Sequence, residues 1–241
     1  KHGLPVTDAP VIYPGARCDL FGVDIMKRSL PEPLGDAFGS YKKPLGSRDN
    51  PLRVCFAGLM MKTKGAHTVA ESLIILKKRG IDTYASFAGG DFETGYKEAI
   101  KGILDKERLK NQVLFTGQLT RNQLARFFNL QHVSIFPSIY PEAFGIVGAE
   151  AMASGIILVS SGVGGAHELI ENGVSGLLFE AGNAESLSNT LEYLIRLPID
   201  QFKAIAKAGQ NRVREFFSIE NASRQIEEAF QATRVSNRAS I

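Results

Sequence analysis

Short apolar or β-branched runs alternate with longer segments of helical periodicity along most of this 241-residue chain. Each run is followed by a turn and then by a helical segment, which is the pattern of βαβ units in a parallel sheet. We predict seven strands, at residues 10–13, 53–57, 84–88, 112–115, 133–136, 156–159 and 176–179. The sequence therefore favours an α/β fold with a doubly wound, Rossmann-like parallel sheet and helices on both of its faces.

Signals for helix ends and helix faces lie between the predicted strands. Thr120 and Gln123 form a capping box that opens one helix, and Asn183 caps a later one. Two apolar stripes recur at helical spacing, and we expect both to face the core. They are Val69, Leu73 and Leu76 in the helix after the second strand, and Ala222, Ile226, Ala229 and Phe230 in the last helix.

The composition is that of a globular protein, with 44% hydrophobic and 22% charged residues. We predict a single domain over residues 1–241, with an opening strand segment at 1–20, an irregular connection at 21–51 and a core at 52–241. The connection is rich in Gly, Pro and Ser, which interrupt regular elements. Its length is unusual for a compact domain.

Charge and cysteine content narrow the classes of partner. The formal net charge of +3 comes from scattered Lys and Arg residues, which argues against a nucleic-acid partner but leaves open an anionic ligand or peripheral association with a membrane. Cys18 and Cys55 lie at no CxxC or metal-ligand spacing, so we expect reduced thiols and a cytoplasmic location. No apolar run approaches the ~20 residues of a transmembrane helix. The start at Lys1 carries no signal peptide, and we expect a further segment upstream of it.

The loop after strand 53–57 is a candidate phosphate site, because ligands of open parallel sheets bind beyond the carboxyl ends of the strands. It contains Gly58, Lys62, Lys64 and Gly65 directly before a helix. Glycines let the backbone approach a phosphate, the helix N-terminus offers unpaired N–H groups, and lysine adds full charge. A solvated basic turn is the alternative. The Walker pattern GxxxxGK[ST] is absent.

A second candidate follows strand 133–136, where Pro137 and Ser138 precede Glu142 and a helix that includes Glu150. If this helix starts near Gly145, the N–H groups of residues 145–147 can bind a pyrophosphate or a sugar hydroxyl. Glu150 then lies about 7 Å inside the helix. The two carboxylates can flank one extended ligand, with Glu142 at a sugar and Glu150 at a ribose. The alternative is that both are surface charges.

Two weaker candidates complete the loops at this edge. Gly117, Gln118 and Leu119 can present backbone groups and the Leu119 side chain to a base, although a plain turn fits equally well. The glycine turn at residues 162–165 brings a flexible backbone to the end of another strand. The sequence contains no nucleophile elbow, zinc spacing or Asp-x-Asp motif, which disfavours a metal-dependent mechanism.

Together these motifs resemble, in order and spacing, the C-terminal domain of the retaining GT-B glycosyltransferases of family 4, also called glycosyl transferases group 1. The resemblance runs from about residue 11 to residue 230. Residues 11–16 are similar to the family's strand that leads from its first domain into its second. The motifs that carry it are Gly58…Lys64-Gly65, Pro137-Ser138…Glu142-x7-Glu150, Gly164-Gly165…Glu168 and Asn172-Gly173…Gly176-Leu177-Leu178.

The resemblance implies one half of a GT-B fold that transfers a sugar, with retention and without a metal or other cofactor, from a UDP-, GDP- or ADP-sugar. The acceptor would be a sugar or a lipid-linked glycan, in polysaccharide or glycoconjugate synthesis, in the cytoplasm or at the inner face of the membrane. Lys64 would neutralise the leaving diphosphate and Glu142 would hold the donor sugar. The expected donor-binding residues are Gly58, Lys62, Gly117, Gln118, Leu119, Ala143, Phe144, Gly145, Ile146, Val147 and Glu150.

The resemblance also implies that the acceptor-binding N-terminal domain is absent from this chain, so we expect the chain alone to bind a donor without turnover. Leu59 stands where the family often has Arg. Lys62 is the candidate substitute, as a point charge less specific than a bidentate guanidinium. His167 stands where the family often has Pro, which changes the turn but not the expected chemistry. Two other functions stay open: a sugar-nucleotide-binding module without transfer activity and, less favoured, a sugar-nucleotide epimerase on the same architecture.

Overall fold

The computed structural model describes residues 11–22 and 44–238, and its centre is one six-stranded parallel sheet. The strand order is β3-β2-β1-β4-β5-β6. The strands are β1 (Leu52–Ala57), β2 (Thr83–Ala88), β3 (Val113–Gly117), β4 (Val133–Phe136), β5 (Ile157–Ser160) and β6 (Leu177–Leu178). Their order reverses between β1 and β4, as in doubly wound nucleotide-binding sheets. The predicted α/β fold is confirmed.

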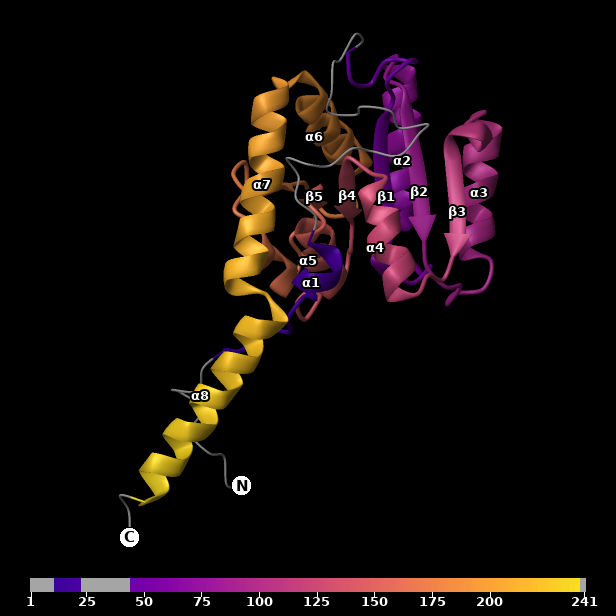
Figure 1. The fold of residues 1–241 in the computed structure, drawn as a ribbon. Helices are drawn as coiled ribbons and strands as arrows, with labels where there is room; N and C mark the ends of the chain where they lie inside the picture. The colour runs from indigo at the N-terminus through magenta and orange to yellow at the C-terminus, as the bar shows by residue number, and fades with distance from the viewer. Residues whose placement is uncertain (1–10, 23–43, 239–241) are drawn as a thin grey trace.

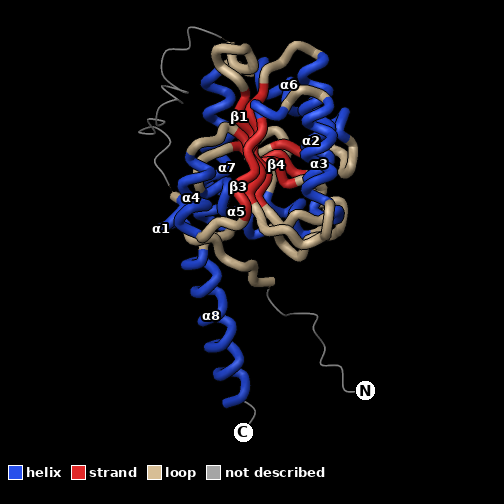
Figure 2. The backbone as a smooth tube through the Cα atoms, turned by 90° about the vertical axis from the view of Figure 1, so that its right-hand side faces the viewer, coloured by secondary structure: helices blue, strands red, loops and turns tan. Residues whose placement is uncertain are grey.

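Helices cover both faces of this sheet (Figures 1 and 2). One hydrophobic cluster takes its side chains mainly from α2, α3 and α6, and the second takes them mainly from α1, α4 and α5, with α7 contributing to both. The helices are α1 (Cys18–Phe21), α2 (Ala66–Lys78), α3 (Tyr96–Lys106), α4 (Arg121–Asn129), α5 (Ile146–Ala153), α6 (Ala184–Arg196), α7 (Ile199–Phe216) and α8 (Ile219–Arg238). Three 3-10 turns, η2 (Lys62–Lys64), η3 (Lys110–Gln112) and η4 (Gly165–Leu169), complete the elements.

The predicted helix signals act as expected in the first two cases. The Thr120 side chain accepts the Gln123 backbone N–H while Gln123 accepts that of Thr120, so the capping box at α4 is confirmed. Asn183 Oδ1 accepts the backbone N–H of Ser186 at 3.0 Å and caps α6. The first apolar stripe is buried along α2. These local rules hold because each is satisfied within one or two turns of helix.

The last apolar stripe was expected to be core, and this expectation is wrong. Ile226 is 43% exposed and Phe230 is 69% exposed on α8. Figure 1 shows α8 leaving the sheet and extending away from the other helices. Helical spacing identifies a common face but does not say what covers it. None of the helices within residues 11–22 and 44–238 has the length and apolarity to cross a bilayer.

The predicted strand at residues 10–13 is also wrong for the residues that are described. Residues 11–15 pair with no strand, and Ala16 makes only an isolated parallel bridge to Ser218, between α7 and α8. The Tyr13 ring instead packs against Phe144 and Phe217, with ring centroids 5.5 and 5.3 Å away. An apolar run can thus be held by aromatic packing without a backbone ladder.

The segment that follows was predicted to be irregular over residues 21–51. Its stretch at 23–43 lies outside the described residues. Residues 44–51 form turns, with one bridge between Ser47 and Asn50. The short helix α1 was not predicted.

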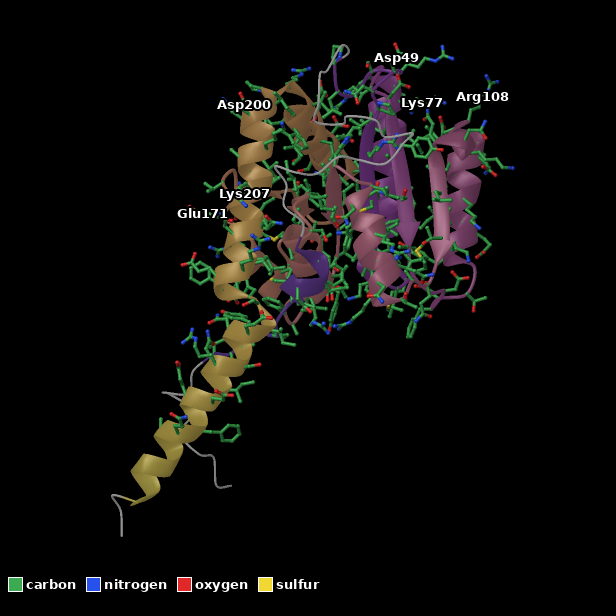
Figure 3. All side chains as sticks on the ribbon, viewed as in Figure 1. Asp49, Lys77, Arg108, Glu171, Asp200 and Lys207 are labelled. Atoms are coloured by element: carbon green, nitrogen blue, oxygen red, sulfur yellow. The ribbon has the colours of Figure 1, made fainter. Side chains whose placement is uncertain are left out.

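Charged side chains are distributed over many elements of the domain. Those labelled in Figure 3, which point outward from separate parts of the surface, are Asp49, Lys77, Arg108, Glu171, Asp200 and Lys207. Both signs of charge therefore mix on the surface, in keeping with a small net charge.

Candidate functional site

A pocket of about 380 Å³ lies where the strand order reverses, between the carboxyl ends of β1 and β4. This is the position at which doubly wound sheets bind ligands. Eight residues expected from the sequence line it: Gly58, Lys64, Glu142, Ala143, Phe144, Gly145, Ile146 and Val147. Six further lining residues had been given no role: Pro14, Phe56, Ala57, Phe136, Pro137 and Ser138. Most of these residues lie at or just after the ends of β1 and β4. Their position beside predicted strand ends was the signal in the sequence that could have identified them.

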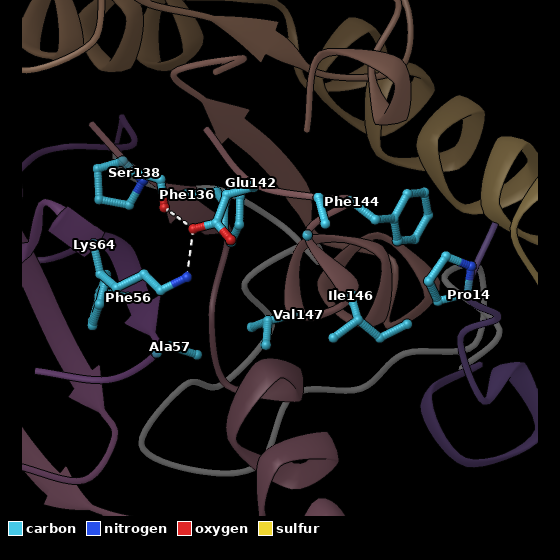
Figure 4. Close-up of a pocket in the computed structure, with 14 residues that line it drawn as sticks. Pro14, Phe56, Ala57, Lys64, Phe136, Ser138, Glu142, Phe144, Ile146 and Val147 are labelled. Carbon is cyan, nitrogen blue, oxygen red and sulfur yellow. Dashed lines mark hydrogen bonds and ion pairs between the residues drawn. The ribbon is translucent and has the colours of Figure 1, made fainter. Parts of the chain in front are cut away.

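Lys64 and Glu142 form an ion pair in this pocket (Figure 4). Lys64 Nζ lies 2.5 Å from Glu142 Oε1, with the lysine side chain 30% and the glutamate side chain 16% exposed. The Ser138 hydroxyl donates to the same oxygen. Charge-assisted contacts in a partly buried site are stronger than those of exposed pairs. The pocket therefore holds one cation and one carboxylate in a defined orientation.

Glycine allows the loops after β1 and β4 to dock backbone against backbone. Gly65 has φ +72°, and a Cβ there would lie 2.0 Å from the Pro137 carbonyl oxygen. The Ile139 backbone N–H donates to the Thr63 carbonyl at 2.9 Å and joins the same two loops. A side chain at residue 65 would push the loops apart. The docking places Lys64 opposite Glu142.

The glycine turn at residues 162–165 holds the backbone of Glu142. The Glu142 N–H donates to the Val163 carbonyl at 3.3 Å, and the Gly165 N–H donates to the Glu142 carbonyl at 2.7 Å. A Cβ at Gly164 would lie 2.5 Å from the Glu142 carbonyl oxygen, and one at Gly165 would lie 2.2 Å from that of Ala143. This turn contributes to the site by fixing the backbone of Glu142 through these hydrogen bonds.

Helix α5 begins at the pocket with unpaired donors. Its N-cap, Gly145, has φ +96° and supplies no capping side chain. In the described part of the chain, no hydrogen bond engages the backbone N–H of Ile146 or Val147. Free N–H groups and the positive end of the helix dipole favour a bound anion.

Helix α2 differs from the expectation that its start offers free donors. The His67 backbone N–H donates to the Tyr96 hydroxyl oxygen at 3.0 Å, and His67 Nδ1 lies 2.7 Å from the same oxygen. Burial lowers the pKa of His67. Tyr96 from α3 thus accepts one of the backbone N–H groups in the first turn of α2. The loop sequence alone could not reveal this contact, because the two residues are far apart in the chain. On this side of the pocket, Lys64 is the group that faces an anion.

Glu150 lies inside α5, is 3% exposed, and does not line the pocket. Burial raises the pKa of its carboxyl group, and the positive charge of Arg121 partly offsets the rise. No hydrogen bond from residues 11–22 or 44–238 reaches its carboxylate oxygens. A buried carboxylate without donors costs free energy, which ligand hydroxyls could recover.

Glu150→Gln should therefore stabilise the free protein at neutral pH by about 1 kcal/mol. A raised folded-state pKa means that Glu150 favours folding while it is protonated, below its ordinary unfolded pKa, and that this contribution is lost as the pH rises through the folded pKa. The advantage of Glu150→Gln should accordingly shrink toward pH ~4. Urea unfolding of both proteins at the two pH values measures it. A variant less stable than wild type at neutral pH would show that Glu150 is satisfied as a charge.

The remaining expected donor-binding residues lie outside the pocket. Lys62 is exposed, and its backbone N–H donates to the Glu93 carboxylate at 2.9 Å. Gly117 ends β3, and Gln118 and Leu119 follow it, two strands away from β1. The Gly89 N–H donates to the Gly117 carbonyl at 2.9 Å, which joins the loop after β3 to the loop after β2. A ligand reaching from the pocket to residues 117–119 must be extended along this edge.

Comparison with known proteins identifies what this architecture is similar to. The sequence profile of the family described as glycosyl transferases group 1 matches residues 38–212. The uncharacterized glycosyltransferase MJ1607 of Methanocaldococcus jannaschii is 26% identical over 149 residues, which are 62% of this chain and 37% of that protein. The chain spans less than half the length of the curated relatives it matches.

Two solved structures have the same fold. Anabaena Alr3699/HepE in complex with UDP-glucose has a TM-score of 0.76 and 25% identity, covering 92% of this chain and 57% of that one. The C-terminal domain of the glycosyl transferase group 1 family protein LpcC from Francisella tularensis has a TM-score of 0.69 and 22% identity, covering 85% of this chain and all of that one. With the profile matched over most of its length, this chain belongs to the glycosyl transferases group 1 family.

Proposed function

We propose that this chain binds the nucleoside diphosphate sugar donor of a retaining, metal-independent GT-B glycosyltransferase of family 4. The observation that carries the proposal is the pocket between β1 and β4, where Lys64, Glu142 and the free N–H groups of α5 converge. A cation and a helix N-terminus suit a diphosphate, while a carboxylate suits sugar hydroxyls. The structure of HepE, which is 25% identical, was solved with UDP-glucose, a ligand of this class.

In this proposal the donor lies along the carboxyl edge of the sheet. The diphosphate sits against the N–H groups of Ile146 and Val147, with Lys64 on its other side. Glu142 receives the sugar hydroxyls, the buried Glu150 accepts the ribose hydroxyls, and the base reaches residues 117–119. The positions of the elements support this order, since the pocket lies at β1 and β4 and the loop proposed for the base lies beyond β2.

Charge stabilisation is the catalytic contribution assigned to these residues. As the bond between the sugar and the diphosphate breaks, negative charge grows on the leaving phosphate oxygen. The dipole of α5 is already oriented toward that charge, and the Lys64 ammonium group turns to it from Glu142. The same groups supply the electrostatic role of a metal ion in a metal-independent transfer.

The acceptor site belongs, in our proposal, to a second domain. The curated relatives are more than twice as long as the part that this chain matches. The exposed side chains of Ile226 and Phe230 on α8 support a partner domain, because apolar groups of this size favour burial. We infer an acceptor sugar or lipid-linked glycan, and a cytoplasmic location at or near the inner membrane face. Cys18 and Cys55, which are not joined in a disulfide, suit a reducing compartment.

A binding module without transfer activity is the second candidate, and the loop after β1 favours it. Leu59 is 45% exposed where the family often has Arg, and the exposed Lys62 does not line the pocket. Among the lining residues that the structure describes, Lys64 is the only one with a cationic side chain. A site with one cation in place of two stabilises a leaving diphosphate less well.

Calorimetric titration of this chain with UDP, GDP and ADP tests the proposal. We expect one nucleotide to bind with a dissociation constant in the micromolar to low millimolar range. Failure of all three to bind at millimolar concentration would refute it. The whole protein, assayed for sugar transfer, separates the transferase from the binding module.

A further inference from the structure

Ser138 is held firmly at the end of β4, in contact with the carboxylate of Glu142. Its side chain is buried, with 1% of the residue exposed. Its hydroxyl donates to Glu142 Oε1, and its carbonyl oxygen accepts the Ser161 hydroxyl at 2.6 Å. The Ser161 backbone N–H in turn donates to the Phe136 carbonyl at 3.0 Å. Ser138 therefore approaches Glu142 from a fixed backbone.

Both contacts to the Glu142 carboxylate converge on one oxygen (Figure 4). Lys64 Nζ and the Ser138 hydroxyl share Oε1, and no hydrogen bond from the described residues reaches Oε2. The second oxygen is thus the one available to a ligand. Because the Glu142 backbone is held by the turn at residues 162–165, the remaining freedom of this side chain lies in its own torsions.

Lys64 cannot provide a lasting restraint on those torsions. A diphosphate in the pocket carries more negative charge than one carboxylate, so it competes for the same ammonium group. When Lys64 turns toward the diphosphate, Ser138 is the side chain that still holds Oε1. The hydroxyl group is neutral and buried, so an arriving anion does not displace it.

We propose that Ser138 is a positioning residue that orients Glu142 toward the donor sugar, an inference that rests on the proposed function. Its hydrogen bond fixes the carboxylate plane and leaves Oε2 facing the sugar hydroxyls. Ser138 thereby favours a sugar nucleotide over the free nucleoside diphosphate. The free diphosphate makes no use of Glu142 and so gains nothing from this restraint.

The test compares the dissociation constants of UDP, GDP and ADP with those of UDP-glucose, GDP-glucose and ADP-glucose. Ser138→Ala should weaken binding of the glucose conjugate of the preferred nucleotide by about 5- to 10-fold, the net loss expected for one hydrogen bond. Binding of the free nucleotide should stay within about twofold. Ser138→Thr keeps the hydroxyl and should restore the ratio. Ser138→Cys, of similar size but a weak donor, should behave as Ser138→Ala and serves if that variant does not fold.

Ser188→Ala is the matched control. Ser188 is equally buried, and its hydroxyl donates to the Ala184 and Ser72 carbonyls between α6 and α2, away from the pocket. This variant should leave the ratio of the two constants unchanged. If Ser138→Ala weakens the binding of the nucleotide and of its glucose conjugate equally, or changes neither, the positioning role is overturned. The proposed function would remain intact in both cases. If the wild-type chain binds no nucleotide, the proposed function falls and this inference falls with it.

Discussion

Replacing Lys64 with alanine should weaken the binding of the preferred nucleoside diphosphate by about 30- to 100-fold, equivalent to about 2–3 kcal/mol. Among residues 11–22 and 44–238, Lys64 is the only cationic side chain that lines the pocket, so its loss leaves the diphosphate with the donors of α5 as its described partners. Part of the cost is offset, because Lys64 must first leave Glu142 Oε1, 2.5 Å away. Calorimetric titration of both proteins measures the change.

Two other lysines give this measurement its controls. Lys78 lies exposed at the far end of α2, so Lys78→Ala reports the effect of one lost charge and should change affinity by less than about twofold. Lys62→Ala asks whether Lys62 replaces the arginine that the family often carries near it. Its exposed position outside the pocket predicts an effect far smaller than that of Lys64→Ala. Equal losses for Lys62→Ala and Lys64→Ala would contradict the assigned role of Lys64.

Gly164→Ala should destabilise the fold by about 2–4 kcal/mol. Gly164 has φ +70°, and a Cβ there would approach the Glu142 carbonyl oxygen to 2.5 Å and its nitrogen to 2.7 Å. The Glu142 backbone must move to admit the methyl group, so nucleotide-sugar binding should also fall. For a domain of this size, the midpoint of thermal unfolding should drop by roughly 5–15 °C.

Gly173→Ala separates the steric effect from the backbone strain. Gly173 has φ +81° but no atom within 4 Å of the position its Cβ would take. Gly173→Ala therefore places a side chain at positive φ, at a cost of about 1 kcal/mol, without the clash. A Gly164→Ala variant no less stable than Gly173→Ala would show that the turn yields freely and does not hold Glu142.

The sequence was sufficient for the sheet and most of its helices because their signals are local. The buried strands β1, β4 and β5 are mostly apolar, and the capping residues of α4 and α6 act within one turn. The pattern failed where burial depends on distant partners. Residues 11–13 look like a strand yet are held by aromatic packing, and the apolar face of α8 has no cover within residues 11–22 and 44–238.

The site was predictable to the extent that parallel strands bring their carboxyl ends together. That rule is enough to join Lys64 to Glu142 and to place α5 beside them. It could not reveal that the Tyr96 hydroxyl oxygen accepts a backbone N–H from the first turn of α2. Nor could it reveal that the Ser138 hydroxyl and Lys64 both contact Glu142 Oε1. These contacts depend on side-chain directions between loops that are far apart in the chain. The glycine turn at residues 162–165 was likewise evident in the sequence. Its backbone contacts with Glu142 are seen only in the structure.

We propose that the diphosphate of a sugar nucleotide binds between Lys64 and the first turn of α5. A crystal structure of this chain with its preferred nucleotide tests this most directly. We predict phosphate oxygens within hydrogen-bonding distance of the Ile146 and Val147 N–H groups, with Lys64 Nζ turned from Glu142 to the diphosphate and the ribose at Glu150. A nucleotide bound elsewhere, with the Lys64–Glu142 ion pair unchanged, would contradict the account.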